Sequence, residues 1–170
     1  MRYRFTWLLS IGLLLACAGP DSVRAQQKVA MPGAEKIVLL VRNSLITLND
    51  ALQTGNFTVL RDMGAPGFRE ANSAASLSRI FSDLVARKID LSTVAVIAPQ
   101  LTQAPGLDQQ KAMLHLKGYF PGQPVQINFE LLYQAVNGSW RLFGISVQPG
   151  TPTGPAPSAG VPGSSAVKKK

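Results

Sequence analysis

The sequence is poor in the residues that build most reactive centres. It contains one cysteine, Cys17, and one histidine, His115. Zinc sites need several cysteine and histidine ligands, so the usual zinc ligand sets are excluded. The glycine patterns that cradle nucleotide phosphates, G-x-x-x-x-G-K-[ST] and G-x-G-x-x-G, are also absent. We therefore expect neither a metal nor another cofactor.

No catalytic set stands out either. The acidic residues of the central region are scattered, and no two have a spacing that pairs them on one helix or strand face. His115 lies between Leu114 and Leu116 in an alternating segment. If the two leucines face the core, His115 points away from it, so no catalytic residue is assigned and binding is expected rather than catalysis.

Positive charge is concentrated at the two ends of the chain. The formal net charge is +8, but residues 30–148 hold ten Lys/Arg against eight Asp/Glu, a net of +2. The central region therefore has no basic stripe of the kind that binds nucleic acid, and we expect no nucleic-acid partner.

Residues 1–25 have the pattern of a secretory signal. Two arginines precede an apolar run over residues 7–16, which is too short to cross a bilayer as an ordinary helix. Cleavage after Ala25 predicts a free periplasmic protein. The alternative is lipidation of Cys17 at a lipobox-like sequence, which would anchor the protein to a membrane. In both cases the mature domain has no disulfide.

The rest of the chain divides into a short linker, one domain and a tail. Residues 26–33 are a polar linker, and residues 34–148 are long enough for one hydrophobic core. Residues 149–170 are rich in Pro, Gly, Ser, Thr and Ala and are predicted to be disordered. The three lysines that end this tail could bind an anionic membrane weakly, although a solubilising role is the simpler interpretation.

The region from Ala34 to Gly55 has the pattern of a long amphipathic helix. Apolar residues recur at intervals of three and four, which places them on one helix face. These residues are Ile37, Val41, Leu45, Leu48 and Leu52. Gly55 follows at the position where glycine commonly ends a helix.

Two further helices are expected before residue 90. A short one, capped by Asn56, buries apolar residues within 57–63. Another begins at Ser73 or Ser76 and ends near Lys88. Its apolar face is predicted to consist of Leu77, Ile80, Phe81, Leu84 and Val85.

From residue 93 the apolar pattern changes to that of β-strands. Strands are expected over residues 93–98, 111–120, 125–136 and 139–147. Asn137-Gly138, between the last two, tolerates positive φ and predicts a two-residue type I′ hairpin turn. The predicted fold class is α+β, with three N-terminal helices packed on one face of a curved four-stranded antiparallel sheet.

The hairpin turn sets the pairing of the last two strands, because Val136 then lies opposite Ser139. Uninterrupted pairing places Phe129, Tyr133 and Trp140 on the face toward the helices. These three aromatic residues are the candidate lining of an apolar pocket, although a packed core is the simpler account.

Uninterrupted pairing also places Leu132 opposite Phe143 and Glu130 opposite Ile145 on the other sheet face. This mixed face is predicted to bind a second copy of the chain, since a half-apolar exposed face often has a partner. The candidate interface residues are Leu132, Arg141, Phe143 and Ile145. Glu130 and Arg141 are expected to form a cross-strand ion pair; a ligand carboxylate held by Arg141 is the alternative.

The order of these elements resembles the nuclear transport factor 2-like, or cystatin-like, α+β cone. Three segments carry the resemblance: the long helix that continues into residues 52–57, Pro66-Gly-Phe-Arg69 before a helix, and the closing hairpin over residues 137–142. The resemblance implies a pocket between the long helix and the sheet, and often dimerisation through the open sheet face. Enzymes of this superfamily place an Asp, or a His/Asp pair, in the cone, and this sequence shows no such pattern.

These observations favour an exported, non-enzymatic binding or assembly domain of the bacterial envelope. Its expected partner is an envelope protein or a small apolar ligand. One alternative is a cone-pocket isomerase-like or dehydratase-like enzyme acting on a hydrophobic substrate. Another is an envelope lipoprotein whose basic tail tethers it to an anionic surface.

Overall fold

The computed structural model describes residues 28–122 and 124–152. The predicted leader, with both processing positions at Cys17 and Ala25, lies outside the described residues, as does most of the predicted tail.

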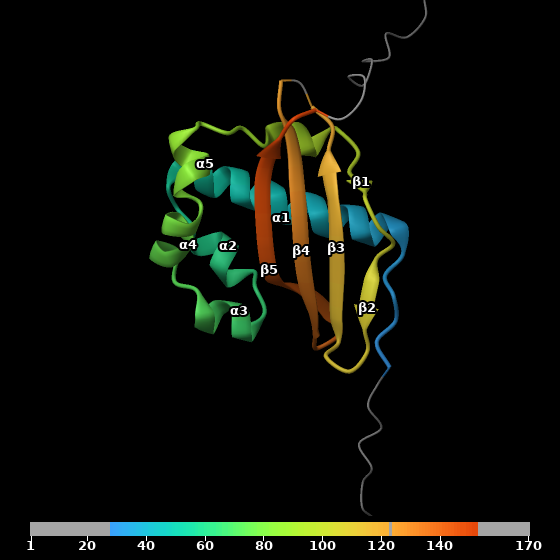
Figure 1. Cartoon of the computed structure of the whole chain (residues 1–170). Helices are drawn as coiled ribbons and strands as arrows, with labels where there is room; N and C mark the ends of the chain where they lie inside the picture. The colour runs from blue at the N-terminus through green and yellow to red at the C-terminus, as the bar shows by residue number, and fades with distance from the viewer. Residues whose placement is uncertain (1–27, 123, 153–170) are drawn as a thin grey trace, which may run out of the picture.

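The described part is an α+β fold in which the helices precede the sheet (Figure 1). The helices are α1 (Ala34–Thr54), α2 (Thr58–Asp62), α3 (Pro66–Ala71), α4 (Ala74–Ile80), α5 (Ser82–Ala86) and the 3-10 helix η1 (Ser92–Ala95). The strands are β1 (Gln100–Leu101), β2 (Gly106–Asp108), β3 (Met113–Phe120), β4 (Gln126–Val136) and β5 (Ser139–Gly150).

Helix α1 matches its sequence pattern. Each residue of the predicted stripe is buried, and Gly55 adopts the left-handed conformation, with φ of 72°, that ends the helix. At the next turn the side chain of Asn56 accepts a hydrogen bond from the Thr58 amide at 3.0 Å, but the N-cap of α2 is Phe57, so Asn56 lies one residue before the position predicted for it.

The remaining helical region is more broken than the sequence predicts. Helix α3 was not expected, and the single helix predicted near residues 73–88 is two short helices, α4 and α5, that meet at Phe81. Ser73 does cap α4 by accepting from the Ser76 amide. Because of the break, Ile80 is 60% exposed and Val85 is 44% exposed, so neither belongs to the buried face.

The strand predicted over residues 93–98 is wrong. Its first half is helix η1, in which Leu91 and Val94 are buried at a helical spacing of three. The Asp90 carboxylate accepts hydrogen bonds from both the amide and the hydroxyl of Ser92, which favours a turn there. Pairing begins only after Pro99, where β1 joins β3.

The sheet is antiparallel, and β3, β4 and β5 are its long strands. The order is β1-β3-β4-β5, and the short strand β2 also pairs with β3. The sheet thus has five strands rather than the predicted four. Strand β5 continues to Gly150, two residues past the predicted end of the domain at Gln148.

The predicted hairpin turn is confirmed, but the register beyond it is interrupted. Asn137 and Gly138 have φ of 50° and 75°, and Val136 pairs with Ser139. Pairing runs without interruption to Tyr133 and Leu142, and a β-bulge then shifts it by one residue.

Because of this shift, every pair predicted beyond the bulge is wrong by one residue. Leu132 lies opposite Gly144 instead of Phe143, and Glu130 lies opposite Ser146 instead of Ile145. Ile145 is the partner of Leu131, which is fully buried, so Ile145 belongs to the helix-facing side of the sheet. Its predicted place on the opposite face is wrong because the extra residue in β5 reverses the alternation.

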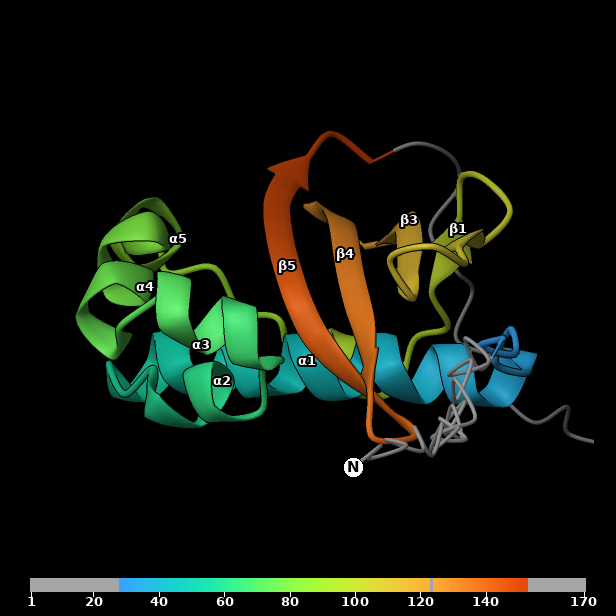
Figure 2. The same ribbon diagram turned by 90° about the horizontal axis from the view of Figure 1, so that it is seen from below.

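The core lies between α1 and the sheet. Figure 1 shows α1 crossing behind the strands, and Figure 2 shows it along one side of the curved sheet, with α4 and α5 standing beside edge strand β5. Leu114, Leu116 and Leu131 project from the inner face and are fully buried. The opposite sheet face, here called the open face, is covered by no helix of the described residues.

Tyr133 provides a polar contact inside this apolar layer. Its hydroxyl donates to the Leu40 carbonyl at 2.8 Å and lies 2.9 Å from the Ser44 Oγ. A phenol has one hydrogen, so the Ser44 hydroxyl is the donor in the second bond. Burial raises the pKa of Tyr133 well above its ordinary value, and the Ser44 hydrogen bond lowers it in part.

We predict that Tyr133→Phe lowers the free energy of unfolding by about 1 kcal/mol, because the buried Ser44 hydroxyl loses its partner. Urea unfolding followed by circular dichroism measures the loss. Tyr119→Phe is the matched control, since the Tyr119 hydroxyl bonds to Gln100 at an exposed position. Equal stability of the two variants would contradict a structural role for the buried bond.

Candidate functional site

Two concave surfaces of the described residues could bind a partner. One is the β5–α5 groove, which separates edge strand β5 from helices α4 and α5. The other is the open-face patch, formed by the apolar side chains Met113, Leu132 and Phe143 on the uncovered side of the sheet.

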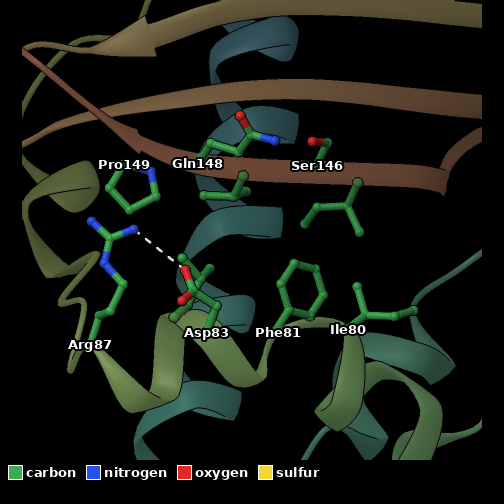
Figure 3. Close-up of a pocket in the computed structure, with 10 residues that line it drawn as sticks. Ile80, Phe81, Asp83, Arg87, Ser146, Gln148 and Pro149 are labelled. Atoms are coloured by element: carbon green, nitrogen blue, oxygen red, sulfur yellow. Dashed lines mark hydrogen bonds and ion pairs between the residues drawn. The ribbon is translucent and has the colours of Figure 1, made fainter.

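The β5–α5 groove has apolar walls and a polar rim (Figure 3). Its volume is about 410 Å³, within the range of roughly 300–1,000 Å³ that is common for ligand pockets. The apolar lining residues are Ile80, Phe81, Leu84, Ile145, Val147 and Pro149. Polar side chains at its rim come from both walls: Asp83 and Arg87 from α5 and its end, Ser146 and Gln148 from β5.

The charges at the groove rim neutralise each other. Arg87 Nη1 lies 3.4 Å from Asp83 Oδ2, and both side chains are more than half exposed to water. An exposed i,i+4 pair of this kind contributes little to stability, so it is free to exchange partners with a ligand. An exposed, paired carboxylate is a poor general base, which limits the acid–base chemistry that the groove can carry out.

On the open face, Glu130 joins two basic side chains. Its carboxylate lies 2.9 Å from His115 Nε2 and 3.3 Å from Lys117 Nζ. Hydrogen bonds from Lys117 and then from His115 lower the pKa of Glu130 below its ordinary value. The expected pair of Glu130 with Arg141 is not among the ion pairs of the described residues: Arg141 lies opposite Gln134, as predicted, but Glu130 pairs with the two basic residues of β3 instead.

The open-face patch lies beside this charged cluster. A shallow cavity of about 560 Å³ is lined by the three patch residues together with Gly106, Leu107, Asp108, Lys111 and His115. None of these lining residues carries a nucleophilic hydroxyl or thiol. His115 points away from the core, as predicted, and is oriented by Glu130.

The sequence-predicted pocket residues are not brought together in one cavity. Tyr133 and Phe129 are buried in the core, where the Phe129 ring packs at 5.6 Å from Phe120. Trp140 borders a different cavity, between the hairpin and residues 28–30. Ligand binding by these three residues stays a prediction, and their surroundings are those of a core.

Of the predicted interface residues, Leu132 and Phe143 do lie together in the open-face patch, and Arg141 is exposed on the same face. Ile145 instead lines the β5–α5 groove. The sequence pattern did not predict the β5–α5 groove. Its signal was the spacing of Leu142, Ile145 and Val147, which fits one inward face only if β5 contains an extra residue.

Comparison with known proteins gives no assignment: no protein-family profile, curated protein or solved structure matches this chain. Within the described residues, no helix is both long and apolar enough to span a membrane. Those residues also contain no cluster of three or more His, Cys, Asp or Glu side chains suited to a metal ion.

We predict that Glu130→Gln destabilises the protein only above acid pH. The lowered pKa of Glu130 in the folded state means that its ion pairs stabilise the fold above the ordinary pKa of 4.5. This contribution disappears as the pH falls through the lower folded-state value. At pH 7 the loss should be below about 1 kcal/mol, since the pairs are partly exposed.

Urea unfolding of both proteins from pH 7 down to pH 3 tests this prediction. Glu70→Gln, at an exposed position of α3, is the control and should show no such pH dependence. If the difference in unfolding free energy between Glu130→Gln and the parent protein were the same at every pH, the stabilising role of the Glu130 ion pairs would be contradicted.

Proposed function

We propose that this protein is an exported, non-enzymatic assembly domain that forms a homodimer through the open face of its sheet. The observation that supports this proposal best is the open-face patch. Phe143 is 38% exposed there, beside Met113 and Leu132, and only one edge of its ring lies near a helix, at Gly67 of α3. Export is supported only by the sequence pattern of residues 1–25.

The charges around the patch suit a second copy as the occupant. A two-fold interface brings the same surface of both copies together, so that surface must complement itself. Basic Arg141, Lys117 and Lys111 and acidic Glu130 and Asp108 surround the apolar patch. A two-fold rotation about the patch can therefore place basic groups of one copy opposite acidic groups of the other.

The size of the open face supports a weak dimer. Eight residues of β3, at about 3.3 Å each, span roughly 26 Å, and four rows of strands at about 4.8 Å span roughly 19 Å. The planar area is then about 500 Å² per copy, and the pair together reaches the roughly 1,000 Å² that a biological interface needs. We expect a dissociation constant in the micromolar range.

Binding suits the two concave surfaces better than catalysis does. The open-face cavity offers an oriented His115 but no hydroxyl or thiol nucleophile among its lining residues. The groove offers Asp83, which is exposed and already paired with Arg87. A general base needs an orienting partner and access to a substrate held out of water, and neither surface combines the two.

We predict that Phe143→Glu weakens dimerisation at least tenfold, because it places a charge in the apolar patch that the dimer would bury. Light scattering during size-exclusion chromatography of residues 26–170 measures the dimer fraction at protein concentrations up to tens of micromolar. Arg141→Glu, which changes only an exposed charge, should also reduce dimerisation while preserving the fold.

Val96→Glu is the matched control for both variants. Val96 is 81% exposed and lies after η1, away from the open face. Its substitution should leave the dimer unchanged. A parent protein that is monomeric at tens of micromolar would overturn the proposed function.

A further inference from the structure

Strand β5 has an unused hydrogen-bonding edge. It is a terminal strand of the sheet, and the Leu142 carbonyl points outward, where it accepts from the Ala65 amide at 2.7 Å. Residues of a strand alternate between its two edges, and the bulge after Leu142 adds one residue. The backbone groups of Ile145 and Val147 therefore point to the same outer edge as the Leu142 carbonyl.

Pro149 gives independent support for this assignment. It lies within β5, opposite Ile127, although proline has no N–H to donate to a ladder. Its presence costs no ladder bond only if position 149 faces the outer edge, as the alternation requires. Among the described residues, no backbone bond from another element reaches β5 beyond Leu142.

The free edge borders the β5–α5 groove directly. Figure 3 shows Phe81 and Ile80 facing β5 across the gap, with Ser146 and Gln148 above them on the strand. Ile80 is 60% exposed, which is unusual for an isoleucine beside a core. An unpaired strand edge and the exposed side chain of Ile80 thus face each other across a groove of about 410 Å³, with the buried Phe81 and Leu84 at its base.

We infer that the β5–α5 groove binds an extended segment of another polypeptide, which adds to the sheet as a strand beside β5. The N–H and C=O groups of Ile145 and Val147 provide four backbone hydrogen bonds at strand spacing. Alternate side chains of the bound segment point to the inner side of the sheet and contact Phe81, Leu84 and Ile80. The recognised sequence is therefore one with apolar residues at every second position.

A second copy of the chain does not fit this edge. Its own β5 is flanked by its own α4 and α5, which would collide with those of the first copy. Natural proteins usually protect an edge strand by shortness, charge, proline or a covering element. The other sheet edge is protected in this way, since β1 has two residues and β2 has three. In β5 the protected positions are Leu142, which bonds to Ala65, and Pro149, and the edge between them is open.

Hydrogen exchange of the full chain tests this inference with a defined probe. The probe is a blocked peptide of alternating valine and threonine with a lysine at each end. In the free protein, the amides of Ile145 and Val147 should exchange fast, and those of Ser146 and Gln148, bonded to β4, should exchange slowly. Saturating peptide should slow exchange at Ile145 and Val147 at least tenfold.

Two N-methylated versions of the peptide separate strand addition from simple apolar contact. Methylation of the valine nitrogens blocks an antiparallel ladder, and methylation of the threonine nitrogens blocks a parallel one. At least one version should bind ten times more weakly than the parent peptide. Equal affinity of all three peptides would overturn the inference.

Ile80→Ser should weaken peptide binding about fivefold, and Val59→Ser, at a similarly exposed position on α2, should not. Phe143→Glu should leave peptide binding intact, so failure of the dimer and failure of the groove are distinguishable.

Binding of laurate in the groove, with no protection of the Ile145 and Val147 amides by any peptide, would make the groove a small-ligand pocket and overturn strand addition.

Discussion

The structure depends most on the β-bulge between Leu142 and Gly144. With uninterrupted pairing, Ser146 and Gln148 would face the helices, and Ile145 and Val147 would face water. Each unpaired buried polar group costs about 1–3 kcal/mol, and burial of each branched apolar side chain contributes about 1.5–3 kcal/mol. The bulge disturbs about one ladder bond, worth roughly 1 kcal/mol, so the bulged register is favoured by several kcal/mol. Gly144 suits this position, since a side-chain carbon there would lie 3.2 Å from Leu132.

The same extra residue shapes both candidate binding surfaces. It removes Ile145 from the open face, so that Phe143, Leu132 and Met113 form the apolar patch there. It also turns Ile145 and Val147 inward, so that they line the β5–α5 groove while their backbone groups face the free edge. A domain that associates through its open face and takes an extended chain at its edge would present two such edges per dimer. This arrangement fits the proposed assembly role.

Local and periodic features were predictable from the sequence, and irregular ones were not. The stripe of α1, its end at Gly55, the turn at Asn137-Gly138 and the outward position of His115 each follow from a short stretch of chain. The break at Phe81 and the helical turn at Ser92–Ala95 depend on packing against distant elements, which propensity does not report. The predicted pairing of β4 with β5 is wrong because it assumes strict alternation through Phe143, which is the extra residue of the bulge. The groove was missed for the same reason, since its wall consists of Ile145 and Val147.

The register of β5 is therefore the claim to test first. Nuclear Overhauser effects between α-protons connect residues that lie opposite each other without mutual hydrogen bonds in an antiparallel sheet. The bulged register predicts a strong effect between the α-protons of Leu131 and Ile145 in the labelled protein. A strong effect between Leu131 and Gly144 in its place would show uninterrupted pairing. That result would turn Ile145 and Val147 away from the helices, and so remove the groove wall and the outward backbone groups on which strand addition depends.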